Sequence, residues 1–193
     1  MPGKRSSVTD HQNGFTLLEL LIVMTLLAVV LALAVPAYQS TIATNSILSE
    51  SNNLYGDILF IRNEAIKRGQ VVLLCPSSNG NSCNTSVSNN TNWATGWLAL
   101  VAANNSCGDS TGTILRQQKA FTSGDSASYS NAGNTTLCFN RMGYVPSGNV
   151  GMVSFNTPGN IAANRRCVVL AAVGHPQILS SGQTDTTGQY SCP

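Results

Sequence analysis

The sequence contains few charged residues. Asp, Glu, Lys and Arg make up 9% of it, against about 25% in typical soluble domains. Ser, Asn, Thr and Gly supply the polar surface instead, which is typical of a secreted or surface-exposed module rather than a cytosolic enzyme. The formal net charge of +2 gives no support for a nucleic-acid partner by itself. A chain of 193 residues has room for one ordinary domain and an appendage.

The sequence also lacks the motifs that catalysis would require. It has no Gly-x-Ser-x-Gly elbow, phosphate loop or paired metal motif. No Cys-x-x-Cys pair occurs, and the imidazole ligands are limited to His11 and His175. His175 with Asp109, Asp125 and Asp185 is a poor set from which to build a nucleophile and its base. We therefore expect a protein that is not an enzyme and that binds no cofactor or metal.

The six cysteines all follow the long apolar segment: Cys75, Cys83, Cys107, Cys138, Cys167 and Cys192. An even number on one side of a membrane anchor favours disulfides in an oxidising compartment over a metal site or free thiols. Closing the short loop between Cys75 and Cys83 costs little chain entropy, and Cys167 with Cys192 would fasten the tail. Six cysteines allow 15 pairings, among which we expect Cys75–Cys83, Cys107–Cys138 and Cys167–Cys192.

An apolar run from Phe15 to about Tyr38 dominates the N-terminal part. It is long enough to cross a hydrocarbon core of about 30 Å as a helix. Residues 1–14 are polar and include Lys4 and Arg5, which favours a cytoplasmic leader and a head on the opposite side. Glu19 is the single charge within the run. A carboxylate there costs a few kcal/mol and indicates a functional residue, although a tolerated charge near the helix end is the alternative.

The string Gly14-Phe15-Thr16-Leu17-Leu18-Glu19 resembles the type IV prepilin signature. The resemblance implies that a prepilin peptidase cuts between Gly14 and Phe15 and methylates the Phe15 amine. It also implies that Glu19 offsets the N-terminal amine of a neighbouring subunit during assembly, a charge pair that would relieve two desolvation penalties. The expected partners are other major and minor pilins or pseudopilins, the peptidase and the inner-membrane assembly platform.

Beyond the apolar run, residues 39–68 keep a helical period, with Glu50, Asp57, Arg62 and Lys67 at the intervening polar positions. Residues 69–193 then have a β-rich pattern. Short apolar runs alternate there with Gly, Asn, Ser and Pro clusters, and the expected strands are Val71–Cys75, Gly96–Ala102, Thr113–Arg116, Thr136–Tyr144, Gly151–Phe155, Arg166–Val173 and Gln177–Leu179. The segments Ser77–Asn92 and Ser180–Pro193 are expected to be loops.

The sequence therefore predicts an α+β protein with the type IV pilin fold. Its expected parts are a leader (1–14), a transmembrane and fibre-core helix (15–38) and a periplasmic head (39–193), in which an amphipathic helix packs on an antiparallel sheet. The head would first stand in the periplasm, tethered to the inner membrane, and later in a fibre at the cell surface.

The segment Ile61–Arg68 followed by Val71–Cys75, then Trp93, Gly96-Trp97 and Ile114–Arg116, resembles the GspH/FimT branch of these proteins. The branch implies a minor pilin that initiates or joins a type IV pilus for twitching motility, adhesion or competence. Two alternatives stay open: a minor pseudopilin of a type II secretion system, and a DNA-binding tip pilin for natural transformation.

Members of this branch often carry a Gly-Arg-x-Arg motif on a C-terminal hairpin, which some use to contact DNA. The matching position here reads Gly174-His175-Pro176-Gln177, so both arginines are absent and a plain turn is favoured. Arg165 and Arg166 lie nearby in the sequence and are candidates for DNA contact. Two arginines are few for a protein that binds DNA through many phosphates, so we expect any DNA binding to be weak.

Overall fold

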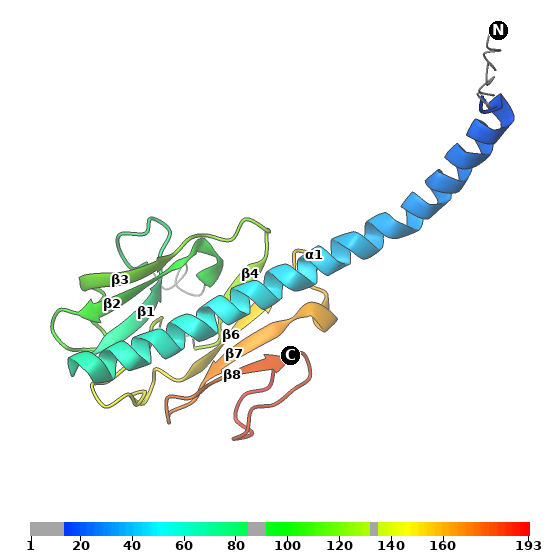
Figure 1. Cartoon of the computed structure of the whole chain (residues 1–193). Helices are drawn as coiled ribbons and strands as arrows, with labels where there is room; N and C mark the ends of the chain where they lie inside the picture. Colours follow the sequence, from blue (N-terminus) through cyan, green and yellow to red (C-terminus); the bar gives the residue numbers. More distant parts are fainter. Residues whose placement is uncertain (1–13, 85–91, 132–134) are drawn as a thin grey trace, which may run out of the picture. The chain divides into compact units, whose positions relative to one another are not determined.

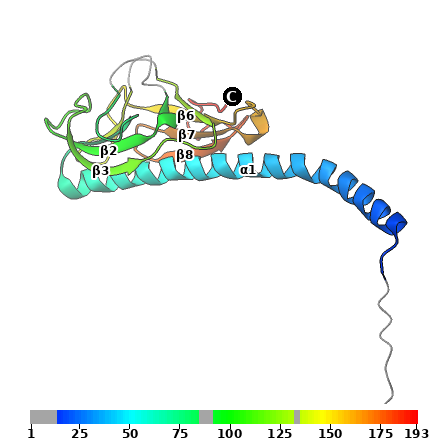
Figure 2. The ribbon, with the colours of Figure 1, turned by 90° about the horizontal axis from the view of Figure 1, so that it is seen from above.

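The computed structural model describes residues 14–84, 92–131 and 135–193 (Figures 1 and 2). Its first element is the helix α1 (Leu17–Arg68), which begins two residues after the expected start at Phe15. The chain divides after Ser40 into two compact units. We call the described part of the first unit, residues 14–40, the anchor, and the second unit, Thr41–Pro193, the head.

The head contains the second half of α1 and two four-stranded antiparallel sheets, ordered β3-β2-β1-β5 and β4-β6-β7-β8. The elements are β1 (Val72–Pro76), the 3₁₀ turn η1 (Trp93–Thr95), β2 (Trp97–Ala102), β3 (Gly112–Gln118), β4 (Ser126–Tyr129), β5 (Leu137–Phe139), β6 (Gly151–Asn156), the 3₁₀ turn η2 (Ala162–Asn164), β7 (Arg166–Leu170) and β8 (Pro176–Ser180). The predicted α+β class is confirmed.

A single large core joins the helix to both sheets. Helix residues at a three-to-four spacing are fully buried in it: Ile47, Leu54, Ile58, Ile61 and Ala65. Alternate residues of the central strands face the same core, since Val72 and Leu74 of β1 and Val168 and Leu170 of β7 belong to it. Figure 2 shows this half of α1 lying along one side of the strands. The apolar face of the helix and the inward-facing alternate residues of the strands therefore pack together in one apolar layer.

The outer faces of the two sheets are buried as well, each under a small apolar cluster. Leu73 and Cys75 of β1 face one cluster, and Cys167 and Val169 of β7 face the other. Strands buried on both faces are continuously apolar, which explains why these two runs in the sequence do not alternate with polar residues.

Several expectations from the sequence were wrong in detail. The strand β4 was not foreseen, and the expected strand Thr136–Tyr144 is reduced to Leu137–Phe139 because the Asn140 side chain accepts hydrogen bonds from the N–H groups of Met142 and Tyr144 and closes a turn. The expected strand Arg166–Val173 ends at Leu170. Part of the expected loop Ser77–Asn92, residues 85–91, lies outside the described residues.

Two acids on the helix were also misplaced by the sequence pattern. Glu50 and Asp57 were assigned to polar positions among the apolar ones, but their exposed fractions are 8% and 5%. Both contact residues of the strand layer that lie far away in the sequence. The helix therefore carries buried carboxylates on its packed face, and each needs a partner there.

Candidate functional site

The start of α1 is built around Thr16, one residue after Phe15. The backbone N–H of Glu19 donates to Thr16 Oγ1 at 3.2 Å, and the N–H of Leu20 donates to the Thr16 carbonyl at 3.2 Å. Thr16 and Glu19 thus have the spacing of a capping box. Glu19 occupies the first helical turn, where the helix dipole favours a negative charge. This position lowers the cost of keeping a carboxylate in an apolar helix.

Gly14 and Phe15 precede the helix and are exposed. Phe15 has an exposed fraction of 84%, and a Cβ added at Gly14 would meet no atom within 4 Å. The described part of the chain therefore imposes no steric demand for glycine at position 14. If glycine is required there, the requirement comes from a protein that acts on this junction.

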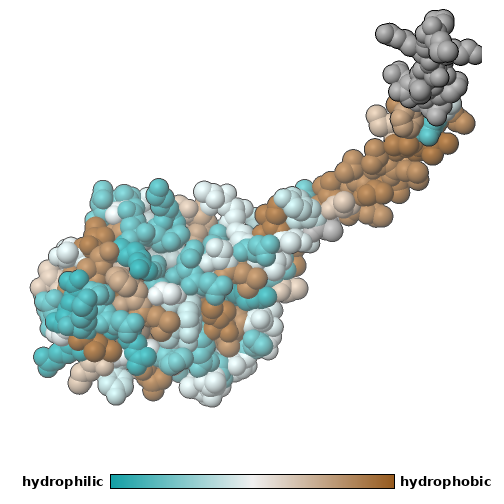
Figure 3. Space-filling model, viewed as in Figure 1, coloured by the Kyte–Doolittle hydropathy of each residue, from teal (hydrophilic) through white to brown (hydrophobic). Residues whose placement is uncertain are grey.

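The anchor exposes an almost continuous apolar surface. Its large side chains from Leu17 to Val35 are between 47% and 81% exposed, and they form the brown run in Figure 3. By length and composition α1 is able to cross a membrane, and none of its most apolar stretch is buried within the chain. Such a surface requires lipid or other apolar helices around it. This anchor and the soluble head are the two functional parts of the molecule.

Asp57 fixes the helix to the first sheet. Its Oδ2 accepts from Trp97 Nε1 at 2.8 Å, and its Oδ1 accepts from Arg116 Nη1 at 2.7 Å. The Arg116 guanidinium also lies 4.1 Å from the centre of the Phe60 ring, a distance at which a cation is attracted to the ring face. One helix carboxylate therefore holds side chains from both β2 and β3.

A second buried group joins the helix to the segment before β4. Ser46 Oγ lies 2.7 Å from Asp125 Oδ2 and 3.3 Å from Glu50 Oε1, and Ser123 Oγ donates to Glu50 Oε1 at 2.8 Å. The other oxygen of each carboxylate is buried and has no hydrogen-bond partner among the residues that the structure describes. Burial, together with the nearby charge of Asp125, raises the pKa of Glu50 to about 7, although the two serine hydroxyls act in the opposite direction.

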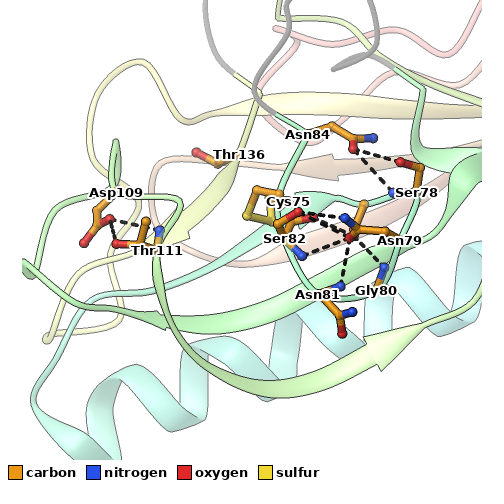
Figure 4. The surroundings of a disulfide bond; sticks show 12 residues. Cys75, Ser78, Asn79, Gly80, Asn81, Ser82, Asn84, Asp109, Thr111 and Thr136 are labelled. Carbon is orange, nitrogen blue, oxygen red and sulfur yellow. Dashed lines mark hydrogen bonds between the residues drawn. A yellow bond between two sulfur atoms is a disulfide. The ribbon is translucent and has the colours of Figure 1, made fainter.

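The structure joins the six cysteines as Cys75–Cys83, Cys107–Cys138 and Cys167–Cys192, the pairs expected from the sequence. Each bond lies at one of the two outer clusters and fastens a polar segment over it. Figure 4 shows the first of these segments, in which the Asn79 side chain accepts from the N–H groups of Asn81 and Ser82 at 2.9 and 3.0 Å. The disulfides therefore hold polar loops over the outer faces of the sheets, where apolar packing alone would not hold such loops.

The two arginines proposed for DNA contact are engaged within the head. Arg165 donates to the side chains of Asn156 and Asn160 and to the carbonyl of Pro193. Arg166 donates to the backbone carbonyls of Ala163 and Arg165. Arg165 therefore holds the C-terminal end, and Arg166 contacts η2, so both arginines have structural roles within the head.

His175 is exposed at the turn before β8, and its Nδ1 lies 3.1 Å from the carbonyl oxygen of Pro176. Among the described residues, no hydrogen bond joins it to Asp109, Asp125 or Asp185, whose carboxylates contact other groups. In the part of the chain that the structure describes, no group of three or more His, Cys, Asp or Glu residues is placed to hold a metal ion.

Comparison with protein families gives two matches along the chain. The family described as type II transport protein GspH matches residues 50–174, more than half of the chain. The chain belongs to the GspH family. The prokaryotic N-terminal methylation motif matches residues 9–35, which contain the Gly14-Phe15 junction and Glu19. The resemblance to the GspH/FimT branch is thereby confirmed, and the family is one of structural pilins and pseudopilins.

Comparison with solved structures places this GspH-family chain near minor pilins and pseudopilins. The minor pilin FimU of Pseudomonas aeruginosa PAO1 superimposes with a TM-score of 0.56 at 17% identity, covering 77% of this chain and 96% of FimU. The minor pseudopilin EpsH of the Vibrio cholerae type 2 secretion system gives a TM-score of 0.48 at 15% identity, over 72% of this chain and 99% of EpsH. Comparison with curated proteins gives no match. The likeness to FimU establishes the fold.

Proposed function

We propose that this protein is a minor pilin, a structural subunit that initiates or joins the assembly of a type IV pilus. The observation that carries the proposal is the order of its parts: a methylation motif at residues 9–35, an exposed apolar helix, and a GspH head at residues 50–174. A head of this family on such a helix suits a subunit that is stored in a membrane and then packed into a fibre core.

In this proposal the prepilin peptidase cleaves between Gly14 and Phe15 on the cytoplasmic face. The new amine at Phe15 then precedes the Thr16 cap of α1. A protonated amine at a helix N-terminus is repelled by the helix dipole, and in an apolar environment it also loses its hydration. The Glu19 carboxylate of a neighbouring subunit would offset both costs. Glu19 lies in the first turn of α1, which begins two residues after Phe15, so a small axial stagger between subunits would bring the charges together.

The charge pattern and the disulfides support the proposed location. Lys4 and Arg5 would remain in the cytoplasm, and the three disulfides of the head suit the oxidising periplasm. The subunit would then be passed by the inner-membrane assembly platform into a fibre that reaches the cell surface.

Processing and fibre membership test the proposal together. Intact-mass analysis should find a chain that begins at a methylated Phe15 in membranes and in sheared fibres. Gly14→Leu should block cleavage because the bulky side chain cannot approach the peptidase, whereas Gly14→Ala should be cut more slowly or normally. Retention of residues 1–14 in cells with an active peptidase would contradict the proposal.

A minor pseudopilin of a type II secretion system is the second candidate, favoured by the description of the matching family model. Deletion of the gene distinguishes the two. Loss of surface pili and twitching with normal protein secretion supports the minor pilin, whereas loss of exoprotein secretion with normal pili supports the pseudopilin. Re-expression of the intact chain should restore the affected fibre in either case.

A further inference from the structure

Three segments that are distant in the sequence meet where α1 ends. Gly143 and Gly174 are buried, each with a φ of 77°, and each lies in a tight turn. A Cβ added at Gly143 would lie 2.6 Å from Ile66 Cδ1. A Cβ added at Gly174 would lie 2.4 Å from the Gly143 carbonyl oxygen and 3.4 Å from Arg62 Nε. Both turns are therefore packed against the last helical turns and against each other.

The residues around these two glycines expose large apolar side chains. Ile66, Met142, Tyr144 and Val173 are 51%, 65%, 54% and 62% exposed. With Arg62 and Arg141 they make up what we call the helix-end patch. Figure 1 shows the loop after β5 and the turn between β7 and β8 at the same end of the head as the C-terminal end of α1, and Figure 3 shows brown atoms among hydrophilic ones there. Met, Tyr and Arg are side chains enriched in protein interfaces.

Arg62 and Arg141 leave the helix-end patch positively charged. The nearby Glu64 carboxylate already forms ion pairs with Lys67 Nζ at 3.8 Å and with Arg68 Nε at 2.5 Å. Within the described ranges neither Arg62 nor Arg141 forms an ion pair. The Nε–H of Arg62 is buried beside the two turns and has no acceptor in the part of the chain that the structure describes. Arg62 is partly exposed and Arg141 is exposed, so their other guanidinium N–H groups are able to donate to a carboxylate of another molecule.

A second copy of this chain is a poor source of such a carboxylate. In the described part of the head, every acid is either buried or held by hydrogen bonds and ion pairs: Glu50, Asp57, Glu64, Asp109, Asp125 and Asp185. Duplex DNA is also disfavoured, since a patch with two unpaired arginines and four apolar side chains offers few phosphate contacts. The complementary surface is apolar and carries an accessible carboxylate.

We propose that the helix-end patch binds the head of a different pilin subunit, through an apolar surface that presents Asp or Glu to Arg62 and Arg141. The proposal rests on the proposed function, because it takes the partner from the same fibre. In the contact, Ile66, Met142, Tyr144 and Val173 would lose their exposure to water, and a carboxylate would pair with the two guanidinium groups.

Photo-crosslinking in cells tests the proposal on the full-length chain. Position 142 is replaced by p-benzoylphenylalanine, and position 161 serves as the control because Ile161 is similarly exposed, at 50%, and lies outside the helix-end patch. We expect an adduct between position 142 and another pilin, identified by mass spectrometry, and little or none from position 161. Arg141→Glu should reduce this adduct about tenfold through like-charge repulsion, while Lys119→Glu, a charge reversal elsewhere, should leave it unchanged.

Each other outcome overturns the proposal. An adduct with a second copy of this chain, an adduct removed by nuclease, or equal adducts from both positions would assign the surface to another use or to none. The same cells are sheared and the fibres collected. If the chain is in the fibre but gives no adduct at position 142, the helix-end patch is not an interface and the proposed function stands. If the processed chain is absent from every fibre, the proposed function fails and this inference fails with it.

Discussion

The two halves of α1 differ in what surrounds them. In the anchor, the helix exposes apolar side chains and carries one acid, Glu19, in its first turn. In the head, the same helix buries Ile47, Leu54 and Ile58 and two acids that contact the strand layer. The large apolar side chains of the anchor half are exposed, whereas those of the head half pack against the strands. In the function we propose, the acid of the anchor serves assembly, whereas the acids of the head half serve folding.

The largest expected effect follows from removing the anchor's acid. Glu19→Leu should leave membrane insertion intact or improved, since a charge is removed from an apolar segment. Recovery of the protein in sheared fibres should fall about tenfold or more, because an unpaired amine in an apolar core costs several kcal/mol. Quantitative immunoblots of the membrane and fibre fractions measure both effects.

Glu19→Asp is the matched control for this change. It keeps the negative charge and should retain most of the incorporation. Wild-type recovery of Glu19→Leu in the fibre fraction would show that the anchor's acid has no role in assembly, and that Glu19 serves as a local cap for α1.

The head should instead lose stability when its covalent links are removed. Replacing both Cys167 and Cys192 with Ser opens a link across a sequence separation of 25 residues and should lower the free energy of unfolding by about 2–5 kcal/mol. Trp93 and Trp97 are fully buried in the head core, so tryptophan fluorescence of the detergent-solubilised chain during denaturation reports on the head. A midpoint equal to that of the intact chain would contradict a stabilising role for the bond.

Asp57 is an acid on the same helix as Glu19, but it lies in the head half and contacts the strands. Asp57→Ala leaves the buried Trp97 Nε1 without an acceptor and should cost about 2–3 kcal/mol of unfolding free energy. Glu64→Ala removes an acid that pairs only with exposed side chains and should cost less. Fluorescence-monitored denaturation compares the two variants. A larger loss in Glu64→Ala would refute the assignment of Asp57 as the main link between the helix and the strands.

The apolar helix of the anchor was predictable from the sequence, because a helix able to cross a membrane needs a continuous run of apolar residues. The run of apolar residues from Phe15 to about Tyr38 lies within one short window of the sequence. The α+β class was predictable for a similar reason, since the strands β1, β2 and β7 are short apolar runs between turn residues. The Cys75–Cys83 pair was expected from its short loop and Cys167–Cys192 from the need to fasten the tail, which left Cys107 with Cys138.

The contacts of the head half of α1 were not predictable, because their partners are far away along the chain. Trp97 lies 40 residues from Asp57 and Ser123 lies 73 residues from Glu50. The strand β4 was missed because only Ala127 and Tyr129 of its four residues are buried. The helix-end patch was not foreseen because it depends on two turns that pack against the helix only in the folded head.

The smallest expected effect concerns the pH dependence of the head. Burial raises the pKa of Glu50 to about 7, from an ordinary value of 4.5. A carboxyl whose pKa is higher in the folded state contributes stability that is present below pH 4.5 and is lost as the pH rises through about 7. Between pH 5 and pH 8 the head should therefore lose about 2 kcal/mol of unfolding free energy through this group, at 1.36 kcal/mol per pKa unit.

Glu50→Gln isolates this contribution, because the amide does not titrate and still accepts a hydrogen bond from Ser123. The variant should lose much less stability than the wild type between pH 5 and pH 8. The pKa values of Glu64, Asp109 and Asp185 are lowered by their hydrogen-bond and charge partners, so their contributions are lost on acidification, below this window. Denaturation curves of both chains at several pH values give the two slopes. Equal slopes would mean that Glu50 is ionised in the folded head over the whole pH range. Burial and the neighbouring Asp125 would then not raise its pKa.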